Sequence, residues 1–218
     1  LDMRFCGSVD AIRALNEGRC TVAGFHVPEQ PGADSRMART YRPMLATGQH
    51  KLIGFAMRQQ GLMVPAGNPL QLKGWSDLLR PDLRFVNRTL GTGTRLLLDN
   101  WLADQGLTGT AIRGYEQEES SHAAVAAFVA SGQADCALGI ASAARAHQLD
   151  FVPLLDEHYW LVCLASELES PAVQQLRHLL TSPLWQAQLQ GMVGYQSSAH
   201  AGQVQSLRSM LPWWQFKS

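Results

Sequence analysis

Two stretches of the chain repeat one order of polar and apolar positions. Residues 8–18 place apolar side chains at helical spacing between a serine and a glycine, and residues 20–25 follow as a short apolar run. Residues 121–132 and 135–140 repeat this order. Serine is typical of the start of a helix and glycine of its end, and a short apolar run is typical of a buried strand. The pattern predicts an α/β fold of two similarly built lobes, unless two ordinary helix–strand units resemble each other by chance.

The remaining pattern predicts further strands and helices. The predicted strands are residues 51–57, 62–64, 151–155 and 159–164, with residues 58–61 as a polar connection between the first two. The predicted helices are residues 75–79, 94–105, 172–180 and 183–190. Residues 30–40 are polar, which predicts an irregular and mobile segment. Residues 211–214 contain two tryptophans, and we expect them to pack on the body of the protein or on a partner.

A strand, a turn and a helix follow one another at residues 84–98, which read RFVNRTLGTGTRLLL. The two glycines of the turn allow the backbone to approach a ligand closely, and Thr92 and Thr94 add hydroxyl groups. The first N–H groups of a helix are unpaired and carry a partial positive charge, so this helix start suits a small oxyanion. Arg88 and Arg95 stand beside the turn, where a guanidinium can balance the charge of the anion. An ordinary capped helix start explains the same residues equally well.

Two other predicted helix starts carry small polar residues, at Ser8 and at Ser121. In open α/β sheets, ligands lie beyond the carboxyl ends of the strands, against helix N-termini. We therefore expect Ser8, Ser121 and Arg88 to surround one donor-rich cup that suits a tetrahedral dianion. His26 follows a predicted strand, and His122 stands at a helix start. Each histidine has two interpretations, as a residue beside the ligand or as a structural or solvated side chain.

Composition narrows the classes of function. The 218 residues suffice for one large domain or two small lobes. Lysine plus arginine and aspartate plus glutamate both number 18, and this zero net charge argues against a broad nucleic-acid surface. No apolar run approaches the ~20 residues that span a bilayer, so we expect no membrane partner. Residues 1–6 do not resemble a signal peptide and are typical of a strand entered midway, so we expect a piece of a longer protein.

The cysteines and histidines form no recognisable catalytic or metal motif. The four cysteines include no C-x-x-C pair and fit buried free thiols in a reducing compartment, so we expect a cytoplasmic protein. The seven histidines lack metal-ligand spacing, and we expect neither a metal nor a cofactor. We expect no enzyme; in the alternative, Cys20 or Cys163 acts with a histidine, but neither stands on a turn at a helix start. The acidic residues within 116–119 predict a solvated loop rather than paired catalytic carboxylates.

Several of these stretches resemble one family. The segment GSVDAIRALNEGRCTVAGFHVPE is similar to the second ligand loop, helix and strand of tungstate- and molybdate-binding proteins, a branch of the type II periplasmic-binding-protein fold. FVNRTLGTGTR is similar to the anion loop between the lobes of that branch, and YEQEESSHAAVAAFVASGQADCALGIASAA to its third loop with the following helix and strand. RQQGLMVPAGNP and SLRSMLPWWQF resemble a cytoplasmic version, in which the domain follows an excisionase-type helix-turn-helix in bacterial transcriptional regulators. The resemblance covers nearly the whole chain.

The resemblance implies a two-lobed type II periplasmic-binding-protein-like fold, with mixed sheets flanked by helices. Lobe I would comprise residues 1–64 and 160–218, and lobe II residues 65–159. The first strand and ligand loop of lobe I precede Leu1 in the family and are missing here. The ligand contacts that carry over are Ser8, Arg88, Thr92, Thr94 and Ser121, and by a looser match His26, Arg95 and His122.

The implied function is a sensor domain for a small anionic ligand, a molybdate- or tungstate-like oxyanion. Closure of the lobes would be coupled to a DNA-binding helix-turn-helix domain that is absent from this chain, so DNA is a partner only through that domain. We expect a homodimer, because dimerisation would cover the sheet surface that the missing strand exposes. One alternative is a periplasmic solute-binding protein of an ABC oxyanion transporter. The other is a dimerisation module that has lost its ligand.

Overall fold

The computed structural model describes residues 2–214; residues 1 and 215–218 lie outside the described part. Within that part the strands form an eight-stranded mixed sheet. The strands are β1 (Val22–Pro28), β2 (His50–Val64), β3 (Phe85–Arg88), β4 (Glu118–Glu119), β5 (Cys136–Ile140), β6 (Asp150–Leu164), β7 (Tyr195–Ser197) and β8 (Val204–Ser206). Their order is β1-β6-β2-β5-β3-β4, with β7 and β8 also paired to β2. β3 runs parallel to β4 and β5, and the other pairs are antiparallel.

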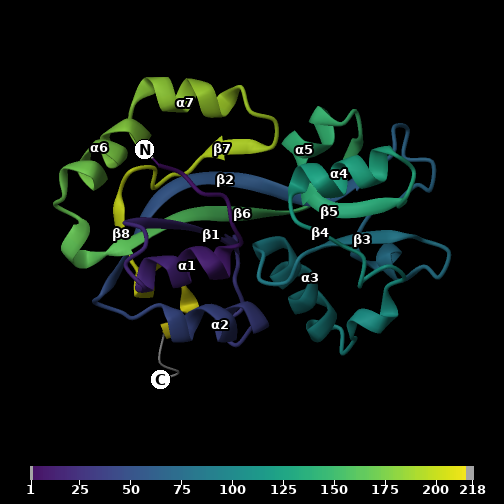
Figure 1. The fold of residues 1–218 in the computed structure, drawn as a ribbon, viewed down its shortest axis with the longest axis horizontal. Helices are drawn as coiled ribbons and strands as arrows, with labels where there is room; N and C mark the ends of the chain where they lie inside the picture. The colour runs from purple at the N-terminus through teal and green to yellow at the C-terminus, as the bar shows by residue number, and fades with distance from the viewer. Residues whose placement is uncertain (1, 215–218) are drawn as a thin grey trace.

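Two strands of 15 residues each, β2 and β6, run through the middle of the molecule (Figure 1). They pair from His50 opposite Leu164 to Val64 opposite Asp150. The prediction of two short strands in each of these places was wrong, because residues 58–61 continue β2 instead of forming a connection. A charged side chain can lie inside the strand here because Arg58 stands opposite Glu157, whose carboxylate offsets the burial of the guanidinium.

Helices cover both faces of the sheet at each end of β2 and β6 (Figure 1). The α-helices are α1 (Ser8–Asn16), α2 (Arg36–Tyr41), α3 (Gly93–Asp104), α4 (His122–Ala130), α5 (Ala141–Ala146), α6 (Pro171–Leu180), α7 (Pro183–Gln190) and α8 (Leu207–Met210). Short 3-10 helices are η1 (Arg42–Met44), η2 (Trp75–Leu79), η3 (Gly109–Ala111), η4 (Ala165–Glu167) and η5 (Pro212–Trp214). None of the helices in residues 2–214 has both the length and the apolar character needed to cross a bilayer.

Most helix predictions are confirmed. The helices predicted at 94–105, 172–180 and 183–190 match α3, α6 and α7 to within one residue at each end. The segment 30–40 is not wholly irregular, because α2 begins at Arg36. The side chain of Ser35 accepts a hydrogen bond from the N–H of Ala38 and caps this short helix.

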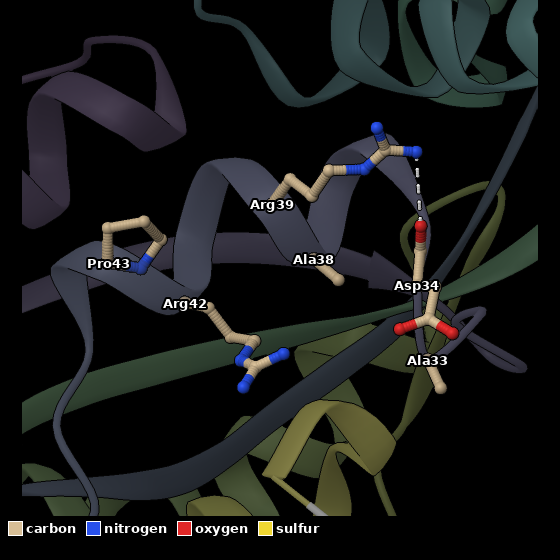
Figure 2. A pocket seen from close by; sticks show the side chains of 6 residues that line it. All are labelled: Ala33, Asp34, Ala38, Arg39, Arg42 and Pro43. Atoms are coloured by element: carbon tan, nitrogen blue, oxygen red, sulfur yellow. Dashed lines mark hydrogen bonds between the residues drawn. The ribbon is translucent and has the colours of Figure 1, made fainter.

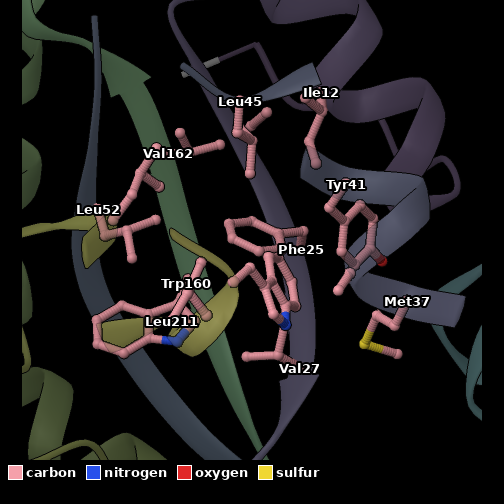
Figure 3. Close-up of a cluster of buried hydrophobic side chains, with 14 of the residues drawn as sticks. Ile12, Phe25, Val27, Met37, Tyr41, Leu45, Leu52, Trp160, Val162 and Leu211 are labelled. Carbon is pink, nitrogen blue, oxygen red and sulfur yellow. The ribbon is translucent and has the colours of Figure 1, made fainter. Parts of the chain in front are cut away.

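The largest apolar cluster lies between the sheet and the helices α1 and α2 (Figure 3). Phe25 of β1 meets Tyr41 of α2 edge to face, with ring centroids 5.4 Å apart. Trp213 packs beside Tyr41 with tilted rings, the ring centroids 5.8 Å apart, and is 2% exposed. The prediction that residues 211–214 pack on the body of the protein is therefore confirmed, and it follows from the cost of exposing two indole rings.

The apolar clusters divide the sheet into two ends. At the β1 end, α1 and α2 cover one face, and α6 and α7 cover the other. At the β4 end, α3 packs on one face, and α4 and α5 pack on the other. β2 and β6 belong to both ends, and β6 continues without a break through residues 159 and 160. The division into lobes at that point stays a prediction.

Candidate functional site

The start of α1 touches the Gly/Thr turn that precedes α3. A Cβ atom added to Gly7 would stand 2.8 Å from the carbonyl oxygen of Gly91, so only glycine fits this approach. The N–H of Val9 donates to the same oxygen at 3.4 Å. The prediction that Ser8 caps α1 was wrong: Gly7 is the N-cap because it makes this close contact, and Ser8 is the first helical residue.

His26 reaches the same place from β1. A Cβ atom added to Gly93 would stand 3.3 Å from Ser8 Oγ and 3.6 Å from His26 Cβ. The imidazole of His26 lies against Tyr159 of β6, with ring centroids 4.0 Å apart. Ser8 and His26 from the β1 end therefore lie beside the first residue of α3 from the β4 end.

Arg88, the last residue of β3, connects this place to the start of α4. Its Nη2 donates to the carbonyl oxygen of Ser120 at 3.0 Å, and Ser121 is the N-cap of α4. Its Nε and Nη1 are buried without a hydrogen-bond partner among residues 2–214. Burial, together with the positive charge of Arg58, lowers the pKa of Arg88 to about 10. A buried guanidinium with unpaired N–H groups is costly by itself, and that cost is offset when an anion accepts from it.

Three buried polar residues that the sequence analysis did not select lie in the same cluster. Arg58 and Glu157 form an ion pair with side chains 7% and 3% exposed. Gln60 Nε2 donates to Thr94 Oγ1 at 2.9 Å and to Glu157 Oε1 at 3.3 Å. Because the charge of Arg58 acts on Arg88, these groups share one electrostatic environment.

His26 and His122 are neutral in this environment. Burial, and after it the positive charge of Arg58, lowers the pKa of His26 well below 6.5. Burial, Arg58 and Arg88 lower the pKa of His122 in the same way. His26 Nε2 and His122 Nδ1 are buried and have no hydrogen-bond partner within the described chain. Two neutral imidazoles therefore add polar atoms to the cluster without adding charge.

The hydroxyl groups of the N-caps Thr92 and Ser121 already take part in hydrogen bonds within the protein. Thr92 Oγ1 accepts from the N–H of Arg95 at 3.3 Å and donates to the carbonyl oxygen of Thr89 at 2.9 Å. Ser121 Oγ accepts from the N–H of Ala124 at 3.0 Å, which leaves its hydroxyl hydrogen for another acceptor. Thr92 thus positions the helix start, while Ser121 keeps a free donor.

Arg95 is held by acidic and aromatic partners, and its Nη1 also donates to the backbone carbonyl oxygen of Arg88 at 3.4 Å. Its Nε donates to Asp99 at 3.1 Å, and its Nη1 pairs with Glu118. Its guanidinium also lies over the ring of Tyr115, 4.3 Å from the centroid. The expectation of a solvated acidic loop was wrong for Glu118, because it belongs to β4 and its side chain is 31% exposed. The structure therefore brings Ser8, His26, Arg88, Thr94 and His122 together, whereas the guanidinium of Arg95 is already paired with Asp99 and Glu118.

Two open cavities lie outside this cluster. One, of about 510 Å³, borders α2 and is lined by Ala33, Asp34, Ala38, Arg39, Arg42 and Pro43 (Figure 2). The other, of about 460 Å³, lies between residues 28–37 and α3. Neither is lined by any of the eight residues predicted as ligand contacts. We place the candidate site at the Arg88 cluster because buried, unpaired donors indicate a ligand more strongly than an open hollow does.

Cys20 and Cys163, the two cysteines considered as nucleophiles, do not have the environment of a catalytic thiol. Burial is the largest cause that raises the pKa of both Cys20 and Cys163, which disfavours the reactive thiolate. In the described residues, no three side chains of histidine, cysteine, aspartate or glutamate gather as metal ligands.

The chain matches known proteins in sequence. The sequence profile of the PBP superfamily domain matches residues 1–181. YvgK, an uncharacterized protein of Bacillus subtilis (strain 168), is 32% identical over 195 residues, which are 89% of this chain and 62% of YvgK. The chain thus spans less than two thirds of the length of YvgK. An uncharacterized protein from the 5′ region of a ferredoxin 2Fe-2S gene of Clostridium pasteurianum is 35% identical over 104 residues, 47% of this chain and 92% of that protein.

Solved structures share the fold at low sequence identity. One, described as a substrate-binding protein of a phosphate ABC transporter with bound phosphate, from Clostridium perfringens, has a TM-score of 0.62 at 13% identity and covers 88% of this chain and 85% of that one. The effector-binding domain of a BenM variant has a TM-score of 0.57 at 19% identity, covering 87% and 81%. A histidine kinase sensor domain with similarity to periplasmic binding proteins has a TM-score of 0.58 at 15% identity, covering 90% and 80%. These matches confirm the predicted fold class, and the chain belongs to the PBP superfamily, with a mixed α/β periplasmic-binding-protein-like fold.

Proposed function

We propose that this domain binds a small tetrahedral oxyanion, of the molybdate or tungstate kind, at the cluster around Arg88. The observation that carries the proposal is the buried guanidinium of Arg88, whose Nε and Nη1 lack partners among the described residues. The starts of α1, α3 and α4 lie around the same cluster, and helix N-termini bind anions through their free N–H groups. The phosphate bound in a protein of the same fold supports an oxyanion as the class of ligand.

The anion would act by holding the two ends of the sheet together. Ser8 and His26 come from the β1 end, and Arg88, Thr94 and His122 come from the β4 end. An anion that contacts both sets binds the form in which Gly7 and Gly91 touch more tightly than a form in which they are apart. Binding then shifts the population toward the closed form, by as much as the two affinities differ.

We propose further that closure is transmitted to a DNA-binding domain, in a cytoplasmic homodimer. The effector-binding domain of a BenM variant and a histidine kinase sensor domain share this fold, which supports a sensor role. YvgK extends beyond the region matched by this chain and leaves room for a further domain in that relative. Ligand-dependent binding of the full-length gene product to DNA would test this step.

The second candidate function is that of a solute-binding protein for an ABC oxyanion transporter. The structural similarity to a protein described as part of a phosphate ABC transporter favours it. Both candidates predict the same kind of ligand but different partners. Association of the full-length protein with a membrane transporter, in place of DNA, would favour the second.

Isothermal titration of the protein with molybdate, tungstate, sulfate and phosphate tests the ligand. Tight binding of one tetrahedral anion, with clear selectivity over the others, is the expected result. The absence of heat with all four anions, from a protein that is folded by circular dichroism, would contradict the proposal. It would direct the search to an organic effector or to a structural role for the domain.

A further inference from the structure

Gln60 is fully buried where β2 passes from one end of the sheet to the other. It is 0% exposed, and the register between β2 and β6 shifts between Gln60 and Gly61. Its side-chain nitrogen donates both to Thr94 Oγ1, at 2.9 Å, and to Glu157 Oε1, at 3.3 Å. One amide group therefore links the two long strands to the first turn of α3.

The carboxylate of Glu157 determines which way this amide points. Glu157 is paired with the guanidinium of Arg58, which stays protonated and would lack a counter-charge if the carboxyl were neutral. An ionised carboxylate only accepts hydrogen bonds, so a reversed amide would place Gln60 Oε1 against it and repel it. The observed orientation leaves Gln60 Oε1 buried without a partner among residues 2–214. The hydrogen bond from Gln60 to Glu157 therefore stabilises this orientation more than a hydrogen-bond partner for Gln60 Oε1 would stabilise the reversed one.

This orientation makes the hydroxyl of Thr94 an acceptor toward Gln60 and leaves its hydrogen for another partner. A hydroxyl carries one hydrogen and two lone pairs, and Thr94 Oγ1 already accepts from Gln60. The described residues offer no acceptor for its hydrogen, although Thr94 is only 2% exposed. Thr94 follows Gly93, which lies against Ser8 and His26 in the candidate site. The hydrogen is thus available to a ligand at the start of α3.

We propose that Gln60 and Glu157 are positioning residues that hold the Thr94 hydroxyl as a hydrogen-bond donor to an unprotonated oxygen of the bound anion. This inference rests on the proposed function and narrows its ligand class. A hydroxyl that donates to the anion favours anions whose oxygens are all unprotonated near neutral pH, such as molybdate and sulfate. It disfavours anions that keep an O–H, such as hydrogen phosphate. Gln60 occupies one lone pair of Thr94 Oγ1. Without Gln60 both lone pairs are free to accept from a phosphate O–H, so the preference for unprotonated anions becomes smaller.

Titration of Gln60→Met, Thr94→Val and the double variant with molybdate, sulfate and phosphate tests the inference. Methionine keeps most of the volume of glutamine but cannot donate, and valine keeps the shape of threonine without the hydroxyl. Gln60→Met is expected to weaken the binding of molybdate or sulfate about fivefold to tenfold and that of phosphate less. In the Thr94→Val background, Gln60→Met is expected to have no further effect.

Two results would overturn the positioning role. One is a loss from Gln60→Met that is equally large in the Thr94→Val background, and the other is an unchanged ratio between the affinities for molybdate or sulfate and for phosphate. If Gln60→Met fails to fold, Thr94→Ser and Thr94→Val still test whether the Thr94 hydroxyl donates to the anion. The serine variant should bind the anion about as tightly as wild type, and the valine variant more weakly. Equal affinity of the two variants rejects the donor role. A wild-type protein that binds none of the anions instead rejects the proposed function, and this inference with it.

Discussion

Arg58 and Glu157 stand opposite each other on the two strands that join the ends of the molecule, and they form a buried ion pair. Their side chains are 7% and 3% exposed. Tyr159, two positions further along β6, places its ring centroid 5.8 Å from the guanidinium carbon of Arg58. The pair allows polar residues to occupy the interior of β2 and places a positive charge near Arg88 and His26.

Replacing Glu157 with alanine should strongly destabilise the protein. The change leaves the guanidinium of Arg58 buried without its counter-charge, and such losses cost about 3–5 kcal/mol. Urea unfolding monitored by circular dichroism measures the difference. The matched control is Asp10→Ala, which removes the partner of Arg13 in an exposed pair and should cost about 0–1 kcal/mol. Equal losses in both variants would show that the buried pair contributes no more than the surface pair.

Arg88→Met should weaken anion binding while stabilising the ligand-free protein. Loss of a buried, charge-assisted partner typically costs about 2–5 kcal/mol, or roughly 30-fold to several thousand-fold in affinity. Removing an unpaired buried cation should at the same time raise the free energy of unfolding by about 0.5–2 kcal/mol. Calorimetric titration and urea unfolding measure the two effects. A variant that keeps the wild-type affinity would remove Arg88 from the site.

Arg95→Met should have the opposite effects: a lower stability of the protein and little change in its affinity for the anion. Arg95 pairs with Asp99 and Glu118, so its loss leaves two acidic side chains without their positively charged partner, one of them 3% exposed. We expect a loss of stability of about 2–4 kcal/mol and a much smaller change in affinity than for Arg88→Met. The same two measurements on both variants provide the comparison. A large loss of affinity with normal stability would instead place Arg95 at the anion.

The parts of the site that the sequence predicted are those with local signals. The start of α3 was predicted because two glycines and two threonines stand directly before an apolar helix. The start of α4 was predicted because Ser121 precedes such a helix, and Ser121 is indeed its N-cap. Short-range capping and periodicity are decided within one or two helical turns, so a single sequence is enough to predict them.

The parts that the sequence analysis missed depend on contacts between distant residues. Arg58 and Gln60 suggested a connection because polar residues followed by Gly61 are typical of a turn. Their burial depends on Glu157, which is 99 residues away from Arg58, and nothing near either residue shows this pairing. A usable signal was the short gap of four residues between the predicted strands 51–57 and 62–64. Such a gap also fits one long strand that passes through both ends of a sheet.

The stability of the protein should fall as the pH is lowered below about 6.5. In the folded state, burial holds the pKa of His26 and His122 well below 6.5, while an unfolded histidine titrates near that value. Between these values the unfolded state binds more protons, so each histidine removes up to about 1.4 kcal/mol of stability per pH unit. The contribution is present above the unfolded pKa and is lost as the pH falls. Urea unfolding at pH 7.5, 6.5 and 5.5 measures the slope.

Substitution of single histidines separates the contributions to this slope. Burial also lowers the pKa of His50 and His158, so the informative quantity is the difference between each variant and wild type. His122→Gln should make stability less dependent on pH than it is in the wild type. Equal slopes for wild type and His122→Gln would mean that His122 does not stay neutral in the folded protein.

The approach of Gly7 to Gly91 predicts that one methyl group at position 7 impairs ligand binding. An alanine Cβ there would lie 2.8 Å from a backbone oxygen, which cannot rotate away as a side chain can, so the start of α1 must withdraw from the turn before α3. Since the proposed anion contacts groups on both sides of this approach, we expect Gly7→Ala to weaken binding about tenfold, in a protein that still folds. Gly74→Ala is the matched control, because Gly74 is also an N-cap with extended backbone but has no atom within 4 Å of an added Cβ. If titration gives wild-type affinity for Gly7→Ala as well as for Gly74→Ala, the anion does not need the two ends of the sheet in contact, and binding would have to be assigned to the β4 end alone.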